Sequence, residues 1–163
     1  MRGFYGIVAL FTFAGCGGPG AEIEGSAGGV DFASIANVYY GGPFVVISTI
    51  EADCEGLDFV KRNYEVGQAP TEDETSMLQL SFMDSDDLLT GVAPVKLTAS
   101  VSASVVRVEG GAFYETIADA GTLTIDEVVD SASATGSFQE LTFADGTLNG
   151  SFEATWCRNL KAR

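Results

Sequence analysis

Apolar and polar residues alternate with a period of two over much of this chain. The clearest run covers residues 95–105, where one set of alternate positions is apolar and the other is polar. The apolar set is Val95, Leu97, Ala99, Val101, Ala103 and Val105. Such alternation is typical of a β-strand that buries one face and exposes the other. The run therefore predicts a half-buried strand, and residues 77–83 show the same spacing.

The C-terminal part of the chain predicts a β-hairpin. Segments 135–143 and 147–157 flank Ala144-Asp145-Gly146, and Asp-Gly supplies the positive φ angles that a tight hairpin turn needs. The tripeptide Gly-Ser-Phe occurs at 136–138 and again at 150–152, once in each arm. Two copies do not define a repeat architecture, and we interpret them as paired strands with similar patterning.

Shorter segments extend the predicted set of strands. They cover residues 34–40, 44–51, 111–116 and 121–128, and segment 44–51 is apolar on both faces, as in a central strand. The best helix candidate is residues 53–63. The sequence thus predicts an all-β fold of seven to nine strands with at most one short helix, arranged as an antiparallel β-sandwich or a small β-barrel. Both architectures bury one face of each strand, and of the two the sandwich is favoured.

Charge and composition exclude several function classes. The formal net charge is −15, and the chain has no histidine. An acidic surface repels phosphate backbones, so nucleic acid is not an expected partner. The lack of histidine excludes Ser-His-Asp and Cys-His triads and histidine-ligated metal sites. The sequence predicts no catalytic residue, no cofactor and no metal.

The first sixteen residues carry a targeting pattern. Arg2 precedes an uncharged apolar run over residues 3–13, followed by the small residues Ala14 and Gly15. This is the layout of a secretory signal, and the run is too short for a transmembrane helix. The tetrapeptide Phe13-Ala14-Gly15-Cys16 resembles the lipobox of bacterial lipoproteins. The alternatives are an ordinary secretory signal with a chance cysteine and a buried N-terminal helix.

The resemblance to lipoproteins implies an anchor and an address. Residues 1–15 are then a signal peptide, Cys16 is the lipidated N-terminus of a tether over residues 16–21, and residues 22–163 are one β domain. Several acyl chains on Cys16 hold a protein firmly on a bilayer, so the expected partner is the membrane through this lipid. Gly17, where an Asp commonly marks inner-membrane retention in that family, implies the outer membrane of a Gram-negative cell envelope.

Two cysteines remain after Cys16, namely Cys54 and Cys157. In an oxidising exported space they most simply pair with each other; the alternative is two buried free thiols. The chain is also similar to small lipoproteins of Gram-negative bacteria with a β-rich domain. The features that carry this similarity are the lipobox, the Gly-Gly-apolar segment Gly28-Gly29-Val30 and the closing sequence Gly-Ser-Phe-Glu-Ala-Thr-Trp-Cys at 150–157. This resemblance implies the same disulfide and no activity.

Other residues were weighed as ligand sites. The acidic groups at 72–74 and at 84, 86 and 87 could offer oxygens to calcium, but they lack the spacing of a calcium loop, which favours solvated turns. A pair of carboxylates could serve a hydrolase. The aromatic residues could form a carbohydrate or lipid platform, although Trp156 shares a face with Phe152 and is expected in the core. The adjacent Tyr39 and Tyr40 should point to opposite faces.

These observations predict an exported, membrane-anchored lipoprotein that is not an enzyme. Its expected role is that of a non-catalytic binding or structural module of the cell envelope, with an unknown envelope protein or glycan as partner. Two alternatives remain open: a carrier of small hydrophobic ligands with a barrel cavity, and a carboxylate-based hydrolase. A cavity lined by Val, Leu and Phe would favour the first, and two acids in a cleft, one with a raised pKa, would favour the second.

Overall fold

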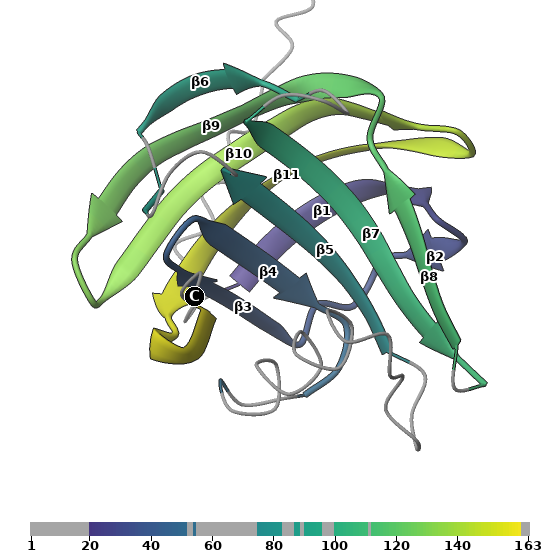
Figure 1. Cartoon of the computed structure of the whole chain (residues 1–163), viewed down its shortest axis with the longest axis horizontal. Coiled ribbons are helices and arrows are strands. Elements are labelled where there is room, and N and C mark those ends of the chain that lie inside the picture. Colours follow the sequence, from purple (N-terminus) through teal and green to yellow (C-terminus); the bar gives the residue numbers. More distant parts are fainter. Residues whose placement is uncertain are drawn as a thin grey trace, which may run out of the picture.

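The structure confirms the all-β class. The computed structural model describes residues 20–51, 54, 75–82, 87, 88, 90–95, 100–110 and 112–160. Within these ranges the chain forms eleven strands and one 3-10 turn, η1 (Arg158–Leu160). The strands belong to a single sheet that curls strongly (Figure 1). No helix in the described ranges is long and apolar enough to cross a membrane.

Nine strands follow one hydrogen-bonded path, in the order β6-β9-β10-β11-β3-β4-β5-β7-β8, while β1 pairs with β11 and β2 pairs with β1. All pairs are antiparallel except β11 with β3. The strands are β1 (Gly20–Ala27), β2 (Val30–Asp31), β3 (Asn37–Gly41), β4 (Phe44–Ser48), β5 (Thr75–Phe82), β6 (Gly91–Pro94), β7 (Val101–Glu109), β8 (Ala112–Ile117), β9 (Ala120–Val129), β10 (Ser133–Phe143) and β11 (Gly146–Trp156).

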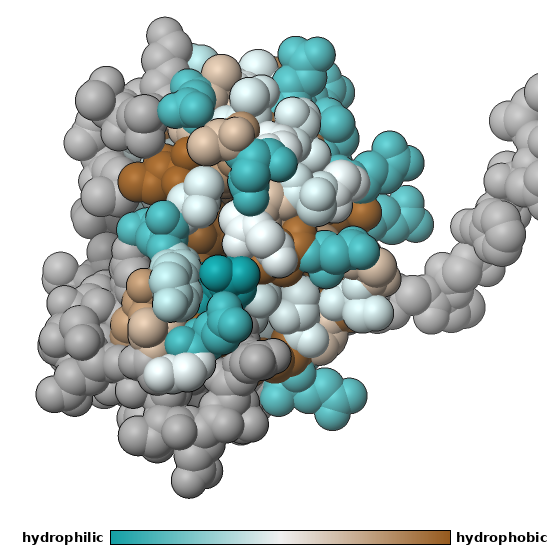
Figure 2. Space-filling model, turned by 90° about the vertical axis from the view of Figure 1, so that its right-hand side faces the viewer, coloured by the Kyte–Doolittle hydropathy of each residue, from teal (hydrophilic) through white to brown (hydrophobic). Residues whose placement is uncertain are grey.

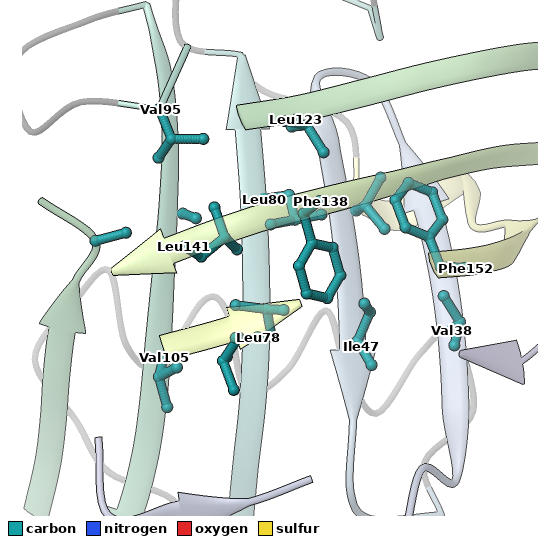
Figure 3. Packing of buried hydrophobic residues seen from close by; sticks show 14 of the residues in the cluster. Val38, Ile47, Leu78, Leu80, Val95, Val105, Leu123, Phe138, Leu141 and Phe152 are labelled. Atoms are coloured by element: carbon teal, nitrogen blue, oxygen red, sulfur yellow. The ribbon is translucent and has the colours of Figure 1, made fainter. Parts of the chain in front are cut away.

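The core lies between the two halves of the curled sheet. Side chains from β9, β10 and β11 pack in one cluster with side chains from β3, β4, β5 and β7. Figure 3 shows Phe138 and Phe152 from one half beside Leu78, Leu80 and Ile47 from the other. Burial of such side chains is worth about 1.5–3 kcal/mol each, so the contact between the halves supplies most of the driving force for folding.

The predicted strand over residues 95–105 is divided in the structure. Val95 follows β6 and donates its amide to the Gly121 carbonyl at 2.9 Å, whereas β7 begins at Val101 and pairs with β5 and β8. Both Val95 and Val101 belong to the same core cluster. The described ends of the run therefore share an apolar period because both face one interior, although Val95 lies after β6 and Val101 begins β7.

Of the other sequence predictions, a central strand is confirmed, the end of the predicted tether belongs to a strand, and several segments lie outside the described residues. Segment 44–51 is confirmed as a central strand over its first part, with Val45 and Ile47 in the core and Val46 in a second cluster on the outer face. Gly20 and Ala21, expected in the tether, are the first residues of β1. The leader, Cys16 and most of the predicted helix 53–63 lie outside the described residues.

The two Gly-Ser-Phe segments interlock across the predicted C-terminal hairpin. The β10–β11 register places Gly136 opposite Phe152 and Phe138 opposite Gly150. A methyl group on Gly136 would lie 2.7 Å from the Phe152 ring, and one on Gly150 would lie 2.7 Å from the Phe138 ring. Each phenylalanine thus covers the glycine of the other segment, an arrangement by which aromatic rings compensate for glycine in a sheet.

The second, outer cluster surrounds the disulfide. It contains Val46, Met77, Val106, Cys157 and Leu160, with Tyr39, Cys54 and Phe113 packed against it. Cys54 and Cys157 are joined, which confirms the predicted disulfide. The bond closes a loop of 103 residues and attaches residue 54 to the C-terminal end of β11.

Substitution of Gly150 tests the interlock. We expect Gly150→Ala to lower the free energy of unfolding by about 1–3 kcal/mol, because the added methyl group would lie 2.5 Å from the Glu22 carbonyl oxygen and 2.7 Å from the Phe138 ring and so overpacks a filled site. Ser151→Ala, one residue further along β11 on an exposed position, is the matched control and should change it by less than about 0.5 kcal/mol. Urea denaturation measures both, and an equal effect of the two substitutions would contradict the interlock.

The disulfide should contribute strongly to stability. We expect Cys54→Ala/Cys157→Ala to lower the free energy of unfolding by about 2–4 kcal/mol, because the open chain regains the entropy that a long closed loop removes from the unfolded state. Denaturation in guanidinium chloride of the oxidised protein and the double variant gives the difference. A loss below about 1 kcal/mol would show that the outer cluster holds this end of the sheet without the covalent bond.

Candidate functional site at the rim of the sheet

One end of the curled sheet forms a rim, at which the turn between β1 and β2 meets β7. Along β7 the residues Val101, Ala103 and Val105 face the core. Arg107 comes two positions after Val105, so its side chain lies on the same inner face, at the edge of the core. A methyl group on Gly28 would lie 2.8 Å from Val105, and one on Gly29 would lie 2.8 Å from Arg107 Nη1. The turn can approach β7 this closely because both of its residues lack a side chain.

Asp145 fastens this turn to a second one. Its Oδ1 accepts a hydrogen bond from the Gly28 amide at 2.9 Å, and its Oδ2 accepts one from the Gly29 amide at 3.0 Å. Asp145 belongs to the turn between β10 and β11, so the carboxylate connects two hairpin ends. The Gly28 amide, followed by the Gly29 amide and the charge of Arg107, lowers the pKa of Asp145, while partial desolvation acts in the opposite direction.

The guanidinium of Arg107 is held mainly by packing. Its Cζ lies 5.0 Å from the centroid of the Tyr114 ring, which is the cross-strand neighbour of Arg107 on β8. Nη2 lies 3.5 Å from Glu109 Oε2, and Nε is buried without a hydrogen-bond partner. A cation over an aromatic ring contributes about 0.5–1 kcal/mol at an exposed site. The side chain is 33% exposed, so part of the guanidinium still reaches solvent.

Two pockets flank Arg107 and share it, together with Gly29. The first, which we call the β5 pocket because Ser76 of β5 lines it, has a volume of about 420 Å³. Its polar lining comes from Asp31, Ser34, Thr49, Ser76, Arg107 and Glu109. The second, which we call the β8 pocket because four residues of β8 line it, has a volume of about 520 Å³. Besides the two shared residues, its lining comes from Gly28, Phe113, Tyr114, Glu115, Thr116 and Asp145. Figure 2 views this side of the molecule and shows hydrophilic side chains dispersed among weakly polar and hydrophobic ones.

The β5 pocket offers hydrogen-bonding groups of three kinds. Arg107 only donates and the carboxylates of Asp31 and Glu109 only accept, whereas the hydroxyls do both. Several of these groups are already fixed: Asp31 Oδ1 accepts from the Ala33 amide at 3.1 Å, and Thr49 Oγ1 donates to the Ser76 carbonyl at 3.0 Å. Such groups can orient a polar ligand at little cost in side-chain entropy.

The aromatic residues considered as a platform are distributed over different parts of the fold. Tyr40 lies in the core and Tyr39 packs against the outer cluster, which confirms that they point to opposite faces. Trp156 packs against the core, as expected, with its ring centroid 5.1 Å from that of Tyr40. Tyr114 is 49% exposed and belongs to the rim.

The acidic segments considered for calcium lie largely outside the described residues, which include only Asp87 among them. Within the described ranges, no group of three or more Asp, Glu, Cys or His side chains is placed to hold a metal ion. The two cysteines predicted to pair are joined in the outer cluster, and neither lines a rim pocket.

Sequence reasoning missed the residues that form the rim. The sequence alone indicates only a turn at Asp145 and only a Gly-Gly-apolar segment at Gly28-Gly29. Arg107 carried a usable signal, since it continues the spacing of Val101, Ala103 and Val105 but places a charge on their apolar face. What the sequence does not reveal is that residues 28, 107 and 145 meet. Comparisons with protein-family models, with curated proteins and with solved structures find no match to this chain.

The hydrogen bonds of Asp145 predict a pH response at the rim. Because the pKa of Asp145 is lower in the fold than the ordinary value of 3.8, the charged form is favoured by folding; its contribution is present above that value and is lost as the pH falls through the lowered pKa. We expect the amide proton shifts of Gly28 and Gly29 to titrate together with a midpoint below 3.8. Nuclear magnetic resonance measures this, and Asp145→Asn should abolish it; a midpoint at or above the ordinary value would contradict the fastening role.

Proposed function

We propose that this protein is an exported lipoprotein of the cell envelope, anchored through Cys16, and that its β domain is a non-catalytic binding module. The lipobox resemblance supports the anchor. The Cys54–Cys157 disulfide supports an oxidising location, since structural disulfides persist mainly outside the cytoplasm. The observation that carries the binding role is the pair of polar pockets on either side of Arg107.

The lining of these pockets distinguishes the module from a carrier of apolar ligands. A carrier needs a cavity lined by hydrophobic side chains. In the described part of the chain the large hydrophobic side chains of the inner face pack on one another in the core, while the rim pockets present hydroxyl and charged groups. This arrangement supports a polar ligand at the rim rather than an apolar one in the interior.

The electrostatics of the rim also support a non-catalytic role. A carboxylate-based hydrolase needs one carboxylic acid with a raised pKa to protonate the leaving group. Asp145, which lines the β8 pocket, has its pKa shifted in the other direction by its two amide hydrogen bonds. Its oxygens are also engaged by Gly28 and Gly29, so it serves the architecture of the rim.

The path of β1 bears on how the proposed anchor and the rim are related. Gly20 lies opposite Glu153, and Ser26, near the other end of β1, lies opposite Thr147. Eight residues of strand span about 26 Å, whereas the four peptide steps from Cys16 to Gly20 reach at most about 14 Å. A lipid on Cys16 would thus lie within reach of the end of β1 that is remote from the rim, which supports an orientation with the pockets away from the bilayer.

We further propose that the domain is best classed as a sandwich rather than a barrel. In the described residues the strand path has two ends, β6 and β8, each paired with one neighbour along the path. A barrel would need these ends to pair with each other. The curled sheet instead places its two halves face to face around one core, as two layers of a sandwich do.

Acylation of Cys16 tests the anchor. We expect the membrane-extracted protein to begin at Cys16 and to carry acyl chains there, as seen by mass spectrometry of its N-terminal peptide. Cys16→Ser should move the protein from the membrane to the soluble fraction, while the control Cys54→Ala/Cys157→Ala should leave it on the membrane. An uncut and unacylated N-terminus would overturn the proposal for the anchor without touching the rim.

A further inference from the structure

We propose that the β5 pocket binds an uncharged sugar unit of a glycan, with the guanidinium of Arg107 and the carboxylates of Asp31 and Glu109 hydrogen-bonded to its hydroxyl groups. This inference rests on the proposed binding role and names the chemistry of the ligand. Its starting point is the composition of the pocket, which combines charged groups of both signs with three hydroxyls in about 420 Å³, a volume within the range of small-molecule sites.

The balance of charges selects against an anionic ligand. One guanidinium in the β5 pocket faces two carboxylates, and Glu115 and Asp145 line the pocket on its other side. An anionic ligand is attracted by Arg107 but repelled by these carboxylates and by the net charge of −15. A cationic ligand is attracted by the carboxylates, but it is repelled by Arg107 at the wall common to both pockets and competes with it for Glu109. A neutral ligand has neither penalty, and it leaves the contact between Arg107 and Glu109 in place.

The hydrogen-bonding capacity of the pocket matches vicinal hydroxyl groups. A hydroxyl donates one hydrogen bond and accepts up to two, so neighbouring hydroxyls of one sugar ring can donate to Asp31 or Glu109 and accept from Arg107. The hydroxyls of Ser34, Thr49 and Ser76 line the same pocket; the Thr49 hydroxyl already donates to the Ser76 carbonyl and can accept from a ligand. A site built to satisfy ligand hydroxyls discriminates strongly, because a ligand that lacks them leaves polar groups unpaired.

The arrangement of the two pockets favours a chain of sugars over a single small molecule. The pockets adjoin at Arg107 and Gly29, so an extended ligand can pass from one to the other across the guanidinium. The β8 pocket adds Tyr114, which is 49% exposed and whose aromatic ring presents an apolar surface to the C–H groups of a second sugar. The proposed orientation of the rim away from the bilayer leaves such a chain room to enter.

Calorimetric titration of the full acylated protein in detergent tests the ligand class. The probes are two neutral sugars, the N-acetylglucosamine tetramer and maltotetraose, with tetragalacturonate as the acidic counterpart and a neutral Ser-Gly tetrapeptide as the peptide control. We expect at least one neutral tetramer to bind at least about tenfold more tightly than tetragalacturonate and the peptide. A tenfold ratio corresponds to about 1.4 kcal/mol.

Variants locate the binding and separate it from folding. Arg107→Gln should weaken binding of the neutral tetramer by about tenfold or more, as expected for loss of hydrogen bonds from a charged group, whereas Arg158→Gln, which changes an exposed arginine outside both pockets, should have no effect. Glu109→Gln is the second variant. It keeps the polar shape but removes a negative charge, so it should shift the preference toward tetragalacturonate, which a merely structural role would not do.

The outcomes decide between the ligand classes. Equal or tighter binding of tetragalacturonate or of the peptide by the wild-type protein overturns the proposal, as does binding of a neutral tetramer that survives Arg107→Gln. If neither neutral tetramer binds at about 10 mM, where even a very weak site with a Kd near 1 mM would be filled, the glycan ligand is wrong. The anchor is judged separately by the acylation of Cys16, so one proposal can fail while the other stands.

Discussion

Strands β11 and β3 run parallel and meet over only two residue pairs in the described part of the chain, Thr155 with Tyr39 and Trp156 with Tyr40. This short joint connects the two halves of the sheet, and several contacts concentrate on it. The Cys157 amide donates to the Tyr40 carbonyl at 2.7 Å, and the Tyr40 hydroxyl donates to the Val129 carbonyl at 2.8 Å. A side chain on Gly41 would meet the Cys157 carbonyl and Leu160, so the approach depends on glycine there.

The rest of the fold depends on this joint because it sets the angle between the halves. When β11 and β3 are held together, the inner face of the hairpin β10–β11 turns toward β4, β5 and β7, and Phe138 and Phe152 fill the space between them. The same turn of the sheet carries the far end of β1 to β7, where Gly28 meets Val105. The rim pockets therefore arise from the curvature of the sheet and collect residues that are distant in sequence.

Local pattern was enough to predict several strands and the C-terminal hairpin, whose arms are neighbours in sequence, but not the pairing of strands that are distant in sequence. The hairpin of β10 and β11, the two-faced strand β4 and the pairing of the Gly-Ser-Phe segments follow from alternation and an Asp-Gly turn, all of which are local signals. The strand β1 escaped prediction because it packs at the margin of the core and exposes Glu22, Glu24 and Gly25, which leaves little period-two contrast.

The elements that sequence reasoning missed share a physical reason. The joint between β3 and β11 joins residues more than 100 positions apart through two pairs, and neither segment carries a mark of its partner. The short strand β6 is exposed over most of its length. The Arg107 site depends on the β1–β2 turn, β7 and the β10–β11 turn, which only the curled sheet brings together. Taken singly, its residues therefore indicate a glycine pair, an isolated charge on a strand and a hairpin turn, but no site.

The two ends of the domain are held in different ways, and this difference bears on the proposed function of an anchored binding module. At the joint, the disulfide, the ring contact of Tyr40 with Trp156 and the outer cluster lie near the start of β1, which is where force from a tether on Cys16 would enter. At the rim, the β1–β2 turn is held by two hydrogen bonds to an exposed carboxylate. Binding regions are drawn from the less stable parts of a fold. Under the proposed function, a domain that is cross-linked by a disulfide at the anchored end and held by hydrogen bonds at the far end can therefore adjust its pockets to a ligand without loosening the anchored end.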